Sequence, residues 1–346
     1  MKHLMKGNDA VTHAALLGGA THFFGYPITP ASEIAHSAAL YFTKAGRTFL
    51  QAESELAAIN MMLGSGASGA RVMTASSSPG VALMSEAISY LAGSEIPCVV
   101  VDIQRVGPGL GNIWPEQSDY NMVLKGGGNG SYKNIVFAPN SVQEMADFTY
   151  KAFEIADKYR MTVFVLSDAF IGQMMEPVEF PTKVLHSKRK DWALYADAES
   201  RKNLLTSIYM DKDQLAANIK HLYTKYKEVE KELIDYEEYL IDDAEYAFVA
   251  FGISSRICLT ATRELRKQGI KIGLMRPKTL FPFPKKRLKE LSKRCKKMMV
   301  VELNEGQMAD DIELSTKSTI PILRYNWHGG NLPKVEELIN CVKRDI

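Results

Sequence analysis

The sequence predicts an α/β protein in which a domain built around a largely parallel sheet precedes a second, smaller α/β domain. From Asn8 to about Asp168, short β-branched or aromatic runs alternate with amphipathic helical stretches, a pattern typical of such sheets. A highly charged stretch over residues 192–246 interrupts this alternation, which resumes at Tyr246. The length of 346 residues fits about two domains of roughly 150 residues each.

The first domain is expected over residues 1–185, with helices on both faces of its sheet. Asn8 is a candidate cap for a helix that runs to Leu17 and stops at Gly18. Ser141 and Glu144 predict a capping box that opens a long helix to about residue 159. The strands expected in this domain cover residues 21–26, 48–51, 71–75, 97–102, 134–138 and 161–167.

Residues 186–243 are predicted to form a charged helical connector with at least one exposed helix, because this stretch is poor in Gly and Pro and rich in helix formers. Residues 244–346 are predicted to form the smaller domain from successive β-α-β units. Its expected strands cover residues 246–251, 270–275 and 297–303, and a helix runs from the turn at 252–255 to Lys267.

The charge balance excludes several classes of partner. The chain has 42 Lys and Arg against 40 Asp and Glu, a net charge of +2, which does not favour nucleic acid or an anionic membrane surface. The first eleven residues lack the apolar core of a signal peptide, and no apolar run approaches the roughly 18 residues that a membrane span needs. We therefore expect a cytoplasmic protein.

The cysteines and histidines predict no metal site within this chain. Cys98, Cys258, Cys295 and Cys341 lie far apart and form no Cys-x-x-Cys pair. The seven histidines form no pair at helical ligand spacing. Any redox metal that the protein uses is therefore expected on another chain.

The segment 25–32 is the first candidate site. A strand is expected to end there, and Thr29 directly precedes Pro30, which suits the first position of a helix. Such a helix would direct free N–H groups toward the carboxyl edge of the sheet, where a carboxylate or phosphate can bind. The alternative is that Thr29 only caps its helix.

Glu53 and Glu55 stand at the next strand-to-helix junction. Residues two apart cannot share one face of a helix, so we expect one of the two side chains to point inward. Acidic residues in a first helical turn usually complement the helix dipole, and a catalytic role is the less common alternative.

Arg105 follows the fourth expected strand and precedes three glycines, at positions 107, 109 and 111. The glycines allow the backbone to approach a ligand closely, and the planar guanidinium suits a carboxylate; a surface turn with a solvated arginine is the alternative. The hydroxyl-rich segment 74–80 ends a further strand, and the glycines of 126–130 predict a lid or a flexible turn. Because carboxyl ends of parallel strands meet at one edge, these segments are expected to share a cleft.

Taken together, the segments 26–32, 53–55, 74–80, 104–111 and 113–120 resemble the α subunit of 2-oxoacid:ferredoxin oxidoreductases. The resemblance covers essentially the whole chain, including a C-terminal domain similar to the transketolase C-terminal fold. The Gly-Pro-Gly-Leu-Gly loop, the Gln-Ser-Asp-Tyr segment and the Gly126-rich stretch are most similar to the 2-ketoisovalerate (3-methyl-2-oxobutanoate) branch. The 2-oxoglutarate branch usually has a Gly-Pro-Ser-Thr-Gly loop in that place.

This resemblance implies half of an active site. The N-terminal domain would bind the aminopyrimidine ring of thiamine diphosphate, and a β subunit would bind the diphosphate through Mg²⁺. Glu55 rather than Glu53 matches the family glutamate that contacts the ring, and Pro27 and Ile28 are expected cofactor contacts. The carboxylate at the ring favours a tautomer that removes the thiazolium proton, which is acid–base catalysis. Thr29 and Arg105 match the residues that hold the carboxylate of the substrate.

The implied reaction is oxidative decarboxylation of a 2-oxoacid to an acyl-CoA, with CoA as co-substrate and two electrons passed to ferredoxin. The iron–sulfur clusters would sit on partner subunits, namely β, γ and, as a further candidate, δ. Pyruvate or 2-oxoglutarate remain alternative substrates. Two further hypotheses are a non-catalytic scaffold or regulatory subunit and a self-contained thiamine enzyme; the latter is disfavoured because no Gly-Asp-Gly stretch with a downstream Asn is present.

Overall fold

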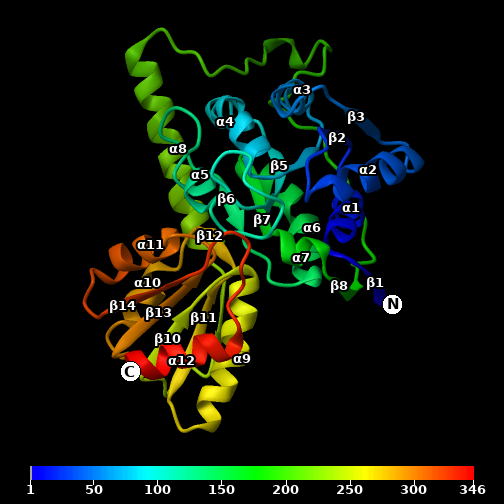
Figure 1. Cartoon of the computed structure of the whole chain (residues 1–346). Coiled ribbons are helices and arrows are strands. Elements are labelled where there is room, and N and C mark those ends of the chain that lie inside the picture. The colour runs from blue at the N-terminus through cyan, green and yellow to red at the C-terminus, as the bar shows by residue number, and fades with distance from the viewer. Residues whose placement is uncertain (1) are drawn as a thin grey trace.

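The computed structural model describes residues 2–346 and has a seven-stranded sheet at the centre of the first domain (Figure 1). The strand order is β12-β6-β7-β5-β4-β2-β3, and every neighbouring pair is parallel except β12 with β6. The strands are β2 (His22–Gly25), β3 (Thr48–Gln51), β4 (Val72–Ser76), β5 (Cys98–Gln104), β6 (Ile135–Phe137), β7 (Thr162–Asp168) and β12 (Thr279–Phe281). The predicted α/β class and largely parallel sheet are confirmed.

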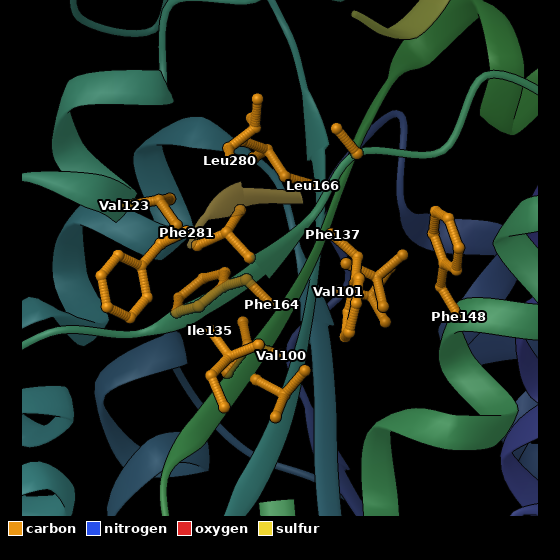
Figure 2. Packing of buried hydrophobic residues seen from close by; sticks show 14 of the residues in the cluster. Val100, Val101, Val123, Ile135, Phe137, Phe148, Phe164, Leu166, Leu280 and Phe281 are labelled. Carbon is orange, nitrogen blue, oxygen red and sulfur yellow. The ribbon is translucent and has the colours of Figure 1, made fainter. Parts of the chain in front are cut away.

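The helices of this domain pack against the sheet in two groups. α1 packs on α2 and α6, and α3 packs on α4. Figure 2 shows Phe148 of α6 and Val123 of α5 on opposite sides of the strands that carry Phe137 and Phe164. The helices are α1 (Gly7–Leu17), α2 (Ser32–Lys44), α3 (Glu55–Ala67), α4 (Ser78–Gly93), α5 (Tyr120–Leu124), α6 (Val142–Tyr159) and α7 (Ala169–Gln173).

Two predicted helix starts were wrong in detail. α1 begins at Gly7, and Asn8 is buried inside the helix, where its amide donates to the carbonyl of Pro30 at 2.8 Å instead of capping. α2 begins at Ser32 without a side-chain cap, so Thr29 does not cap it. Tertiary bonds explain this, because the carbonyls of Thr29 and Pro30 accept from Arg105 and Asn8 rather than from the helix.

The start of α6 follows the prediction more closely. Ser141 Oγ accepts the N–H of Glu144 at 3.1 Å, as a cap should. The carboxylate of Glu144 does not close the box on Ser141, however, because it accepts the N–H of Asn140 and pairs with Arg276 of β11 (Ile272–Pro277).

The second domain has a five-stranded sheet of order β14-β13-β10-β11-β9, in which only β9 is antiparallel to its neighbour. Its remaining strands are β9 (Tyr236–Tyr239), β10 (Tyr246–Val249), β13 (Lys297–Glu302) and β14 (Ile322–Asn326). Its helices are α9 (Gly252–Lys267), α10 (Lys285–Leu291), α11 (Gln307–Thr316) and α12 (Val335–Asp345). The three strands expected here are all present.

Between the domains, the segment predicted as a connector contains a 3₁₀ turn (Ser200–Lys202) and the long helix α8 (Lys212–Glu232), which stands beside the first domain (Figure 1). β9 also lies within the predicted connector, although it belongs to the second sheet. A short pair of strands that the sequence did not indicate, β1 (Lys2–Lys6) and β8 (Met175–Glu179), lies near the N-terminus. No helix within residues 2–346 is long and apolar enough to cross a membrane.

The two domains share a core at β12. This strand follows β11 in the chain but pairs with β6 of the first sheet. Figure 2 shows Leu280 and Phe281 of β12 in one cluster with Val123 and Phe164 of the first domain, and all four side chains are buried. The second domain is therefore fixed against the β6 side of the first sheet by shared apolar burial.

Candidate functional site

The candidate site lies where β2, β3, β4 and β5 end. In the sheet order β5-β4-β2-β3, the chain passes from β2 outward to β3 and then back to β4 on the other side. Such a switch point opens a crevice at the carboxyl ends of the strands, where open α/β sheets bind ligands. Thr29, Glu55, Ser78 and Arg105 all follow strands at this edge.

Arg105 extends from the end of β5 toward the turn after β2. Its side chain is only 8% exposed, and its guanidinium donates to the carbonyl of Thr29 at 2.7 Å and to that of Leu110 at 3.1 Å. Its Nε–H has no partner among the described residues. A buried, charged donor without an acceptor is costly, so the position suits an anionic ligand.

The turn that carries Arg105 is held by its own backbone and by Glu116. The N–H of Val106 donates to the carbonyl of Trp114 at 3.1 Å, and the N–H of Gly107 donates to the carboxylate of Glu116 at 3.1 Å. The glycine loop is therefore tied at its base to the segment that follows it, while Leu110 at its tip is 78% exposed.

Glu55 is the first residue of α3, and its side chain is 5% exposed. Ser54 caps the helix by accepting the N–H of Ala57 at 3.1 Å, which fixes the orientation of the first turn. Glu53 lies before the cap and is exposed. Of the two glutamates, the fold therefore turns Glu55 inward.

Gly80, in the first turn of α4, lies against the carboxylate of Glu55. A β-carbon at Gly80 would lie 2.5 Å from Oε1 of Glu55 and 2.1 Å from Oγ of Ser76. The absence of a side chain at position 80 thus makes the space that the carboxylate occupies. Within residues 2–346, no group donates a hydrogen bond to the carboxylate of Glu55.

Three hydroxyl groups at the end of β4 are also without partners. The side-chain oxygens of Thr74, Ser76 and Ser77 are buried and make no hydrogen bond within the described chain. Buried polar groups are normally satisfied, so these hydroxyls and Glu55 suit a ligand that carries both donors and acceptors. A nitrogen heterocycle with an amino group has that character.

Ser78 connects Arg105 with Asp119. Its hydroxyl accepts the N–H of Arg105 at 3.0 Å and donates to Oδ2 of Asp119 at 2.5 Å. Burial raises the pKa of Asp119 to about 6, although Ser78 and Asp102 act to lower it. Burial and the neighbouring charge of Asp119 raise the pKa of Asp102 well above its ordinary value.

A cavity of about 760 Å³ opens in front of these residues, between the two domains. Arg105, Ser78 and Asp119 line it from the first domain, and Glu305 and His328 line it from the second. This volume is large enough for a small organic ligand and part of a larger one. Within residues 2–346, no group of His, Cys, Asp or Glu could hold a metal ion.

Gln117 fixes the second domain at the rim of this cavity. Its amide donates to the carbonyl of Phe251 at 3.0 Å, and its side-chain oxygen accepts from Ser254 at 3.0 Å and from the N–H of Leu303 at 3.1 Å. Beside it, Asp168 accepts the N–H of Ile253 at 2.9 Å, at the start of α9. Burial raises the pKa of Asp168 to about 6.

The fold brings together only some of the residues that the sequence singled out. Arg105 contacts Thr29 through the carbonyl of Thr29, while the Thr29 side chain is exposed. Pro27 and Ile28 are half-buried, and Ile28 packs against the core. The segment 126–130 is held near α4, since Ser89 donates to Asn129 at 2.7 Å.

Sequence reasoning missed Asp102, Asp119 and Gln117. Asp102 carried a signal, because it is an acidic residue inside the otherwise apolar run of β5 and therefore had to be buried. Asp119 and Gln117 lie in the Gln-Ser-Asp-Tyr segment of the family resemblance, but the sequence did not indicate their roles, since their partners lie on other elements and, for Gln117, in the other domain.

Comparisons with known proteins address the same two parts of the chain. Residues 13–245 match the family model described as "Pyruvate flavodoxin/ferredoxin oxidoreductase, thiamine diP-bdg". Residues 244–338 match "Pyruvate:ferredoxin oxidoreductase core domain II".

Among curated proteins, the chain is 50% identical over 341 residues to the ketoisovalerate oxidoreductase subunit VorB of Methanothermobacter thermautotrophicus, covering 98% of this chain and 97% of that protein. Among solved structures, a 2-oxoglutarate:ferredoxin oxidoreductase from Magnetococcus marinus, with 2-oxoglutarate, coenzyme A and succinyl-CoA bound, matches with a TM-score of 0.92 at 29% identity. That match covers 99% of this chain but 65% of the solved chain. A split-gene transketolase matches with a TM-score of 0.63 at 13% identity, which shows a shared fold only.

Proposed function

The chain belongs to the 2-oxoacid:ferredoxin oxidoreductase family and is a subunit of an enzyme that oxidises 2-oxoacids, and we propose that its substrate is 3-methyl-2-oxobutanoate. One observation at the site supports this proposal most strongly. A buried carboxylate, Glu55, and a buried guanidinium with a free N–H, Arg105, both belong to residues that contact the first turn of α4, at Gly80 and at Ser78.

The first domain belongs to a thiamine-diphosphate-binding family, and its residues fit the aminopyrimidine half of that cofactor. Glu55 offers an acceptor that the chain leaves unused, and the unpartnered hydroxyls of Ser76 and Ser77 lie at the adjoining end of β4. When bound, thiamine diphosphate supplies the electron sink that allows a 2-oxoacid to lose CO₂. We propose Pro27 and Ile28 as further contacts of the ring.

Glu55 would hold a proton at a ring nitrogen of the cofactor. A carboxylate shielded from water makes a stronger hydrogen bond than one in solvent, because the local dielectric constant is lower. Since its neighbour Gly80 and the cap at Ser54 fix its position, the proton is held at one place. This is the role of a general acid–base group.

Arg105 and Thr29 would bind the carboxylate of the substrate. The guanidinium keeps its Nε–H free while its other nitrogens are tied to backbone carbonyls, so it is already oriented before an anion arrives. The exposed Thr29 side chain stands next to the carbonyl that Arg105 contacts and can add a hydroxyl donor.

The branched substrate is favoured over 2-oxoglutarate by the relatives. The chain is 50% identical to a ketoisovalerate oxidoreductase subunit, compared with 35% to the 2-oxoglutarate synthase subunit KorA of Methanocaldococcus jannaschii. We further propose that Mg²⁺ and the iron–sulfur clusters lie on β and γ subunits, with δ as a further candidate. In this proposal ferredoxin accepts the electrons and CoA takes the acyl group. The complex is proposed to be cytoplasmic.

The test uses the complex of this chain with its partner subunits, assayed by viologen reduction with 3-methyl-2-oxobutanoate and CoA. Glu55→Gln should lower kcat at least about a hundredfold, the usual contribution of acid–base catalysis. Glu53→Gln is the matched control, since the side chain lies two residues away and is exposed. The amount of thiamine diphosphate that the complex retains after gel filtration should also fall in Glu55→Gln but not in Glu53→Gln.

Substrate choice is tested separately by comparing 3-methyl-2-oxobutanoate, pyruvate, 2-oxoglutarate and indolepyruvate on the unmodified complex. The highest kcat/KM is expected for the branched acid. Equal values for all four would remove the proposed specificity, and unchanged activity in Glu55→Gln would refute the role of that glutamate.

A further inference from the structure

Asp102 and Asp119 form a buried pair of carboxyl groups behind Arg105. Asp102 is fully buried in β5, and Asp119 is 7% exposed just before α5. The two carboxyls lie close enough for each to act on the pKa of the other. Among the described residues no side chain donates a hydrogen bond to Asp102, and the backbone N–H of Ser78 is the donor that acts to lower its pKa.

This geometry requires a proton within the pair. Two ionised carboxylates that lie close together repel each other, and burial away from solvent further disfavours the ionised form of a carboxyl group. When Asp102 carries the proton, it becomes a donor and Asp119 the acceptor, so both side chains are satisfied with one negative charge between them. Aspartic protease dyads are arranged on the same principle.

The charge of the pair is best placed on Asp119. Asp119 accepts from the hydroxyl of Ser78, and the charge of Arg105 favours its ionised form, although the charge of Glu116 opposes this. Among the groups that shift the pKa of Asp102, none is a cation that could stabilise a negative charge there. Asp119 also shares the wall of the 760 Å³ cavity with Arg105, while Asp102 lies behind it.

Asp119 decides where the hydroxyl of Ser78 points. That hydroxyl lies within reach of two acceptors, Oδ2 of Asp119 at 2.5 Å and the carbonyl of Arg105 at 3.1 Å, and it has one proton. While the proton points to Asp119, a lone pair remains free to accept the N–H of Arg105 at 3.0 Å.

Resting on the function proposed above, we propose that Asp119 positions Arg105 through Ser78 for binding of the 2-oxoacid carboxylate. Asp119 is thus a positioning residue, and Arg105 makes the contact with the substrate. The position of Asp119 is itself fixed, because its N–H donates to the side chain of Gln104 at 3.2 Å and Gln117 is bonded to the second domain.

The test compares three variants in the assembled complex. Asp119→Ala removes the acceptor of Ser78 and should raise KM for 3-methyl-2-oxobutanoate about tenfold, the effect of one lost charged hydrogen bond, with a smaller change in kcat. Asp119→Asn retains an acceptor and should restore KM to within about threefold of the wild type. Asp102→Asn replaces the shared proton by an amide N–H and should likewise stay within about threefold.

A second measurement does not depend on turnover. The rise in melting temperature that 3-methyl-2-oxobutanoate causes in the complex reports binding directly. This rise should shrink in Asp119→Ala and persist in Asp119→Asn. The control is Asp157→Ala, which removes the partner of Arg71 at 2.9 Å and of Lys190 at 2.5 Å, away from the cavity.

The control variant should lower the melting temperature without changing KM. The inference is overturned if Asp119→Ala binds and turns over the substrate with the wild-type KM, or if Asp119→Asn loses as much affinity as Asp119→Ala. An unmodified complex that is inactive on every 2-oxoacid would instead contradict the proposed function, so the two failures are distinguishable.

Discussion

A β-carbon on Gly80 would lie 2.5 Å from Oε1 of Glu55, so the glycine on α4 creates the space for the glutamate on α3. The two residues are 25 positions apart in the chain and meet because α3 packs on α4 at the carboxyl edge of the sheet. The position of the proposed catalytic carboxylate thus depends on a residue that has no side chain.

Gly80→Ala should therefore displace the carboxylate of Glu55. We expect activity to fall by as much as about a hundredfold, because a shift of this size misplaces a catalytic group, and unfolding free energy to fall by about 1–3 kcal/mol. Gly64→Ala on α3 is the control, since a β-carbon there meets nothing within 4 Å. It should keep full activity and gain up to about 1 kcal/mol of stability.

Arg105→Lys should separate charge from geometry. Lysine retains the positive charge but cannot donate to Thr29 and Leu110 and still present a free N–H. We expect KM for the 2-oxoacid to rise about tenfold or more, while the affinity for thiamine diphosphate stays unchanged. Steady-state kinetics together with cofactor titration measure both; a KM equal to that of the wild type would contradict the assignment.

Gln117→Ala should loosen the contact between the domains. The change leaves the N–H of Leu303 without its partner in a buried place, which costs about 1–3 kcal/mol, and it removes the side-chain donor to the carbonyl of Phe251, which keeps the N–H of Ser255. Chemical unfolding measures this loss. Gln143→Ala is the comparison, because Gln143 also makes side-chain hydrogen bonds but lies at the surface, where the change should stay within about 0.5 kcal/mol.

Glu302 should make stability depend on pH. Burial raises its pKa from the ordinary value of 4.5 to about 7, even though the N–H groups of Met308 and Ala309 oppose this. The folded state therefore binds the proton more tightly than the unfolded state. The resulting stability is fully present below about pH 4.5 and is lost as the pH rises through about 7.

Glu302→Gln should remove this contribution. Between about pH 5 and 7, the slope of unfolding free energy against pH should differ from that of the wild type by up to about 1.4 kcal/mol per pH unit. Denaturant unfolding across this range provides the measurement. Parallel slopes in the two proteins would show that Glu302 is not protonated on folding.

Most of the fold follows from local patterns. The strand at 48–51 matches β3 residue for residue, and the helix to residue 159 matches the end of α6, because periodic burial and turn residues act within a few positions of the chain. The same reasoning could not find β12, whose partner β6 lies more than a hundred residues earlier and whose own pattern is only three residues long.

The sequence by itself determined that Thr29, Glu55 and Arg105 follow strands of one parallel sheet, since chain order and strand spacing are enough to place them at a common edge. Only the tertiary structure decided that Glu55 faces inward and Glu53 outward, that Thr29 offers its carbonyl to Arg105 instead of capping α2, and that Asp102 meets Asp119. The physical reason is that these outcomes depend on hydrogen bonds and packing between elements, which compete with the local preferences and outweigh them.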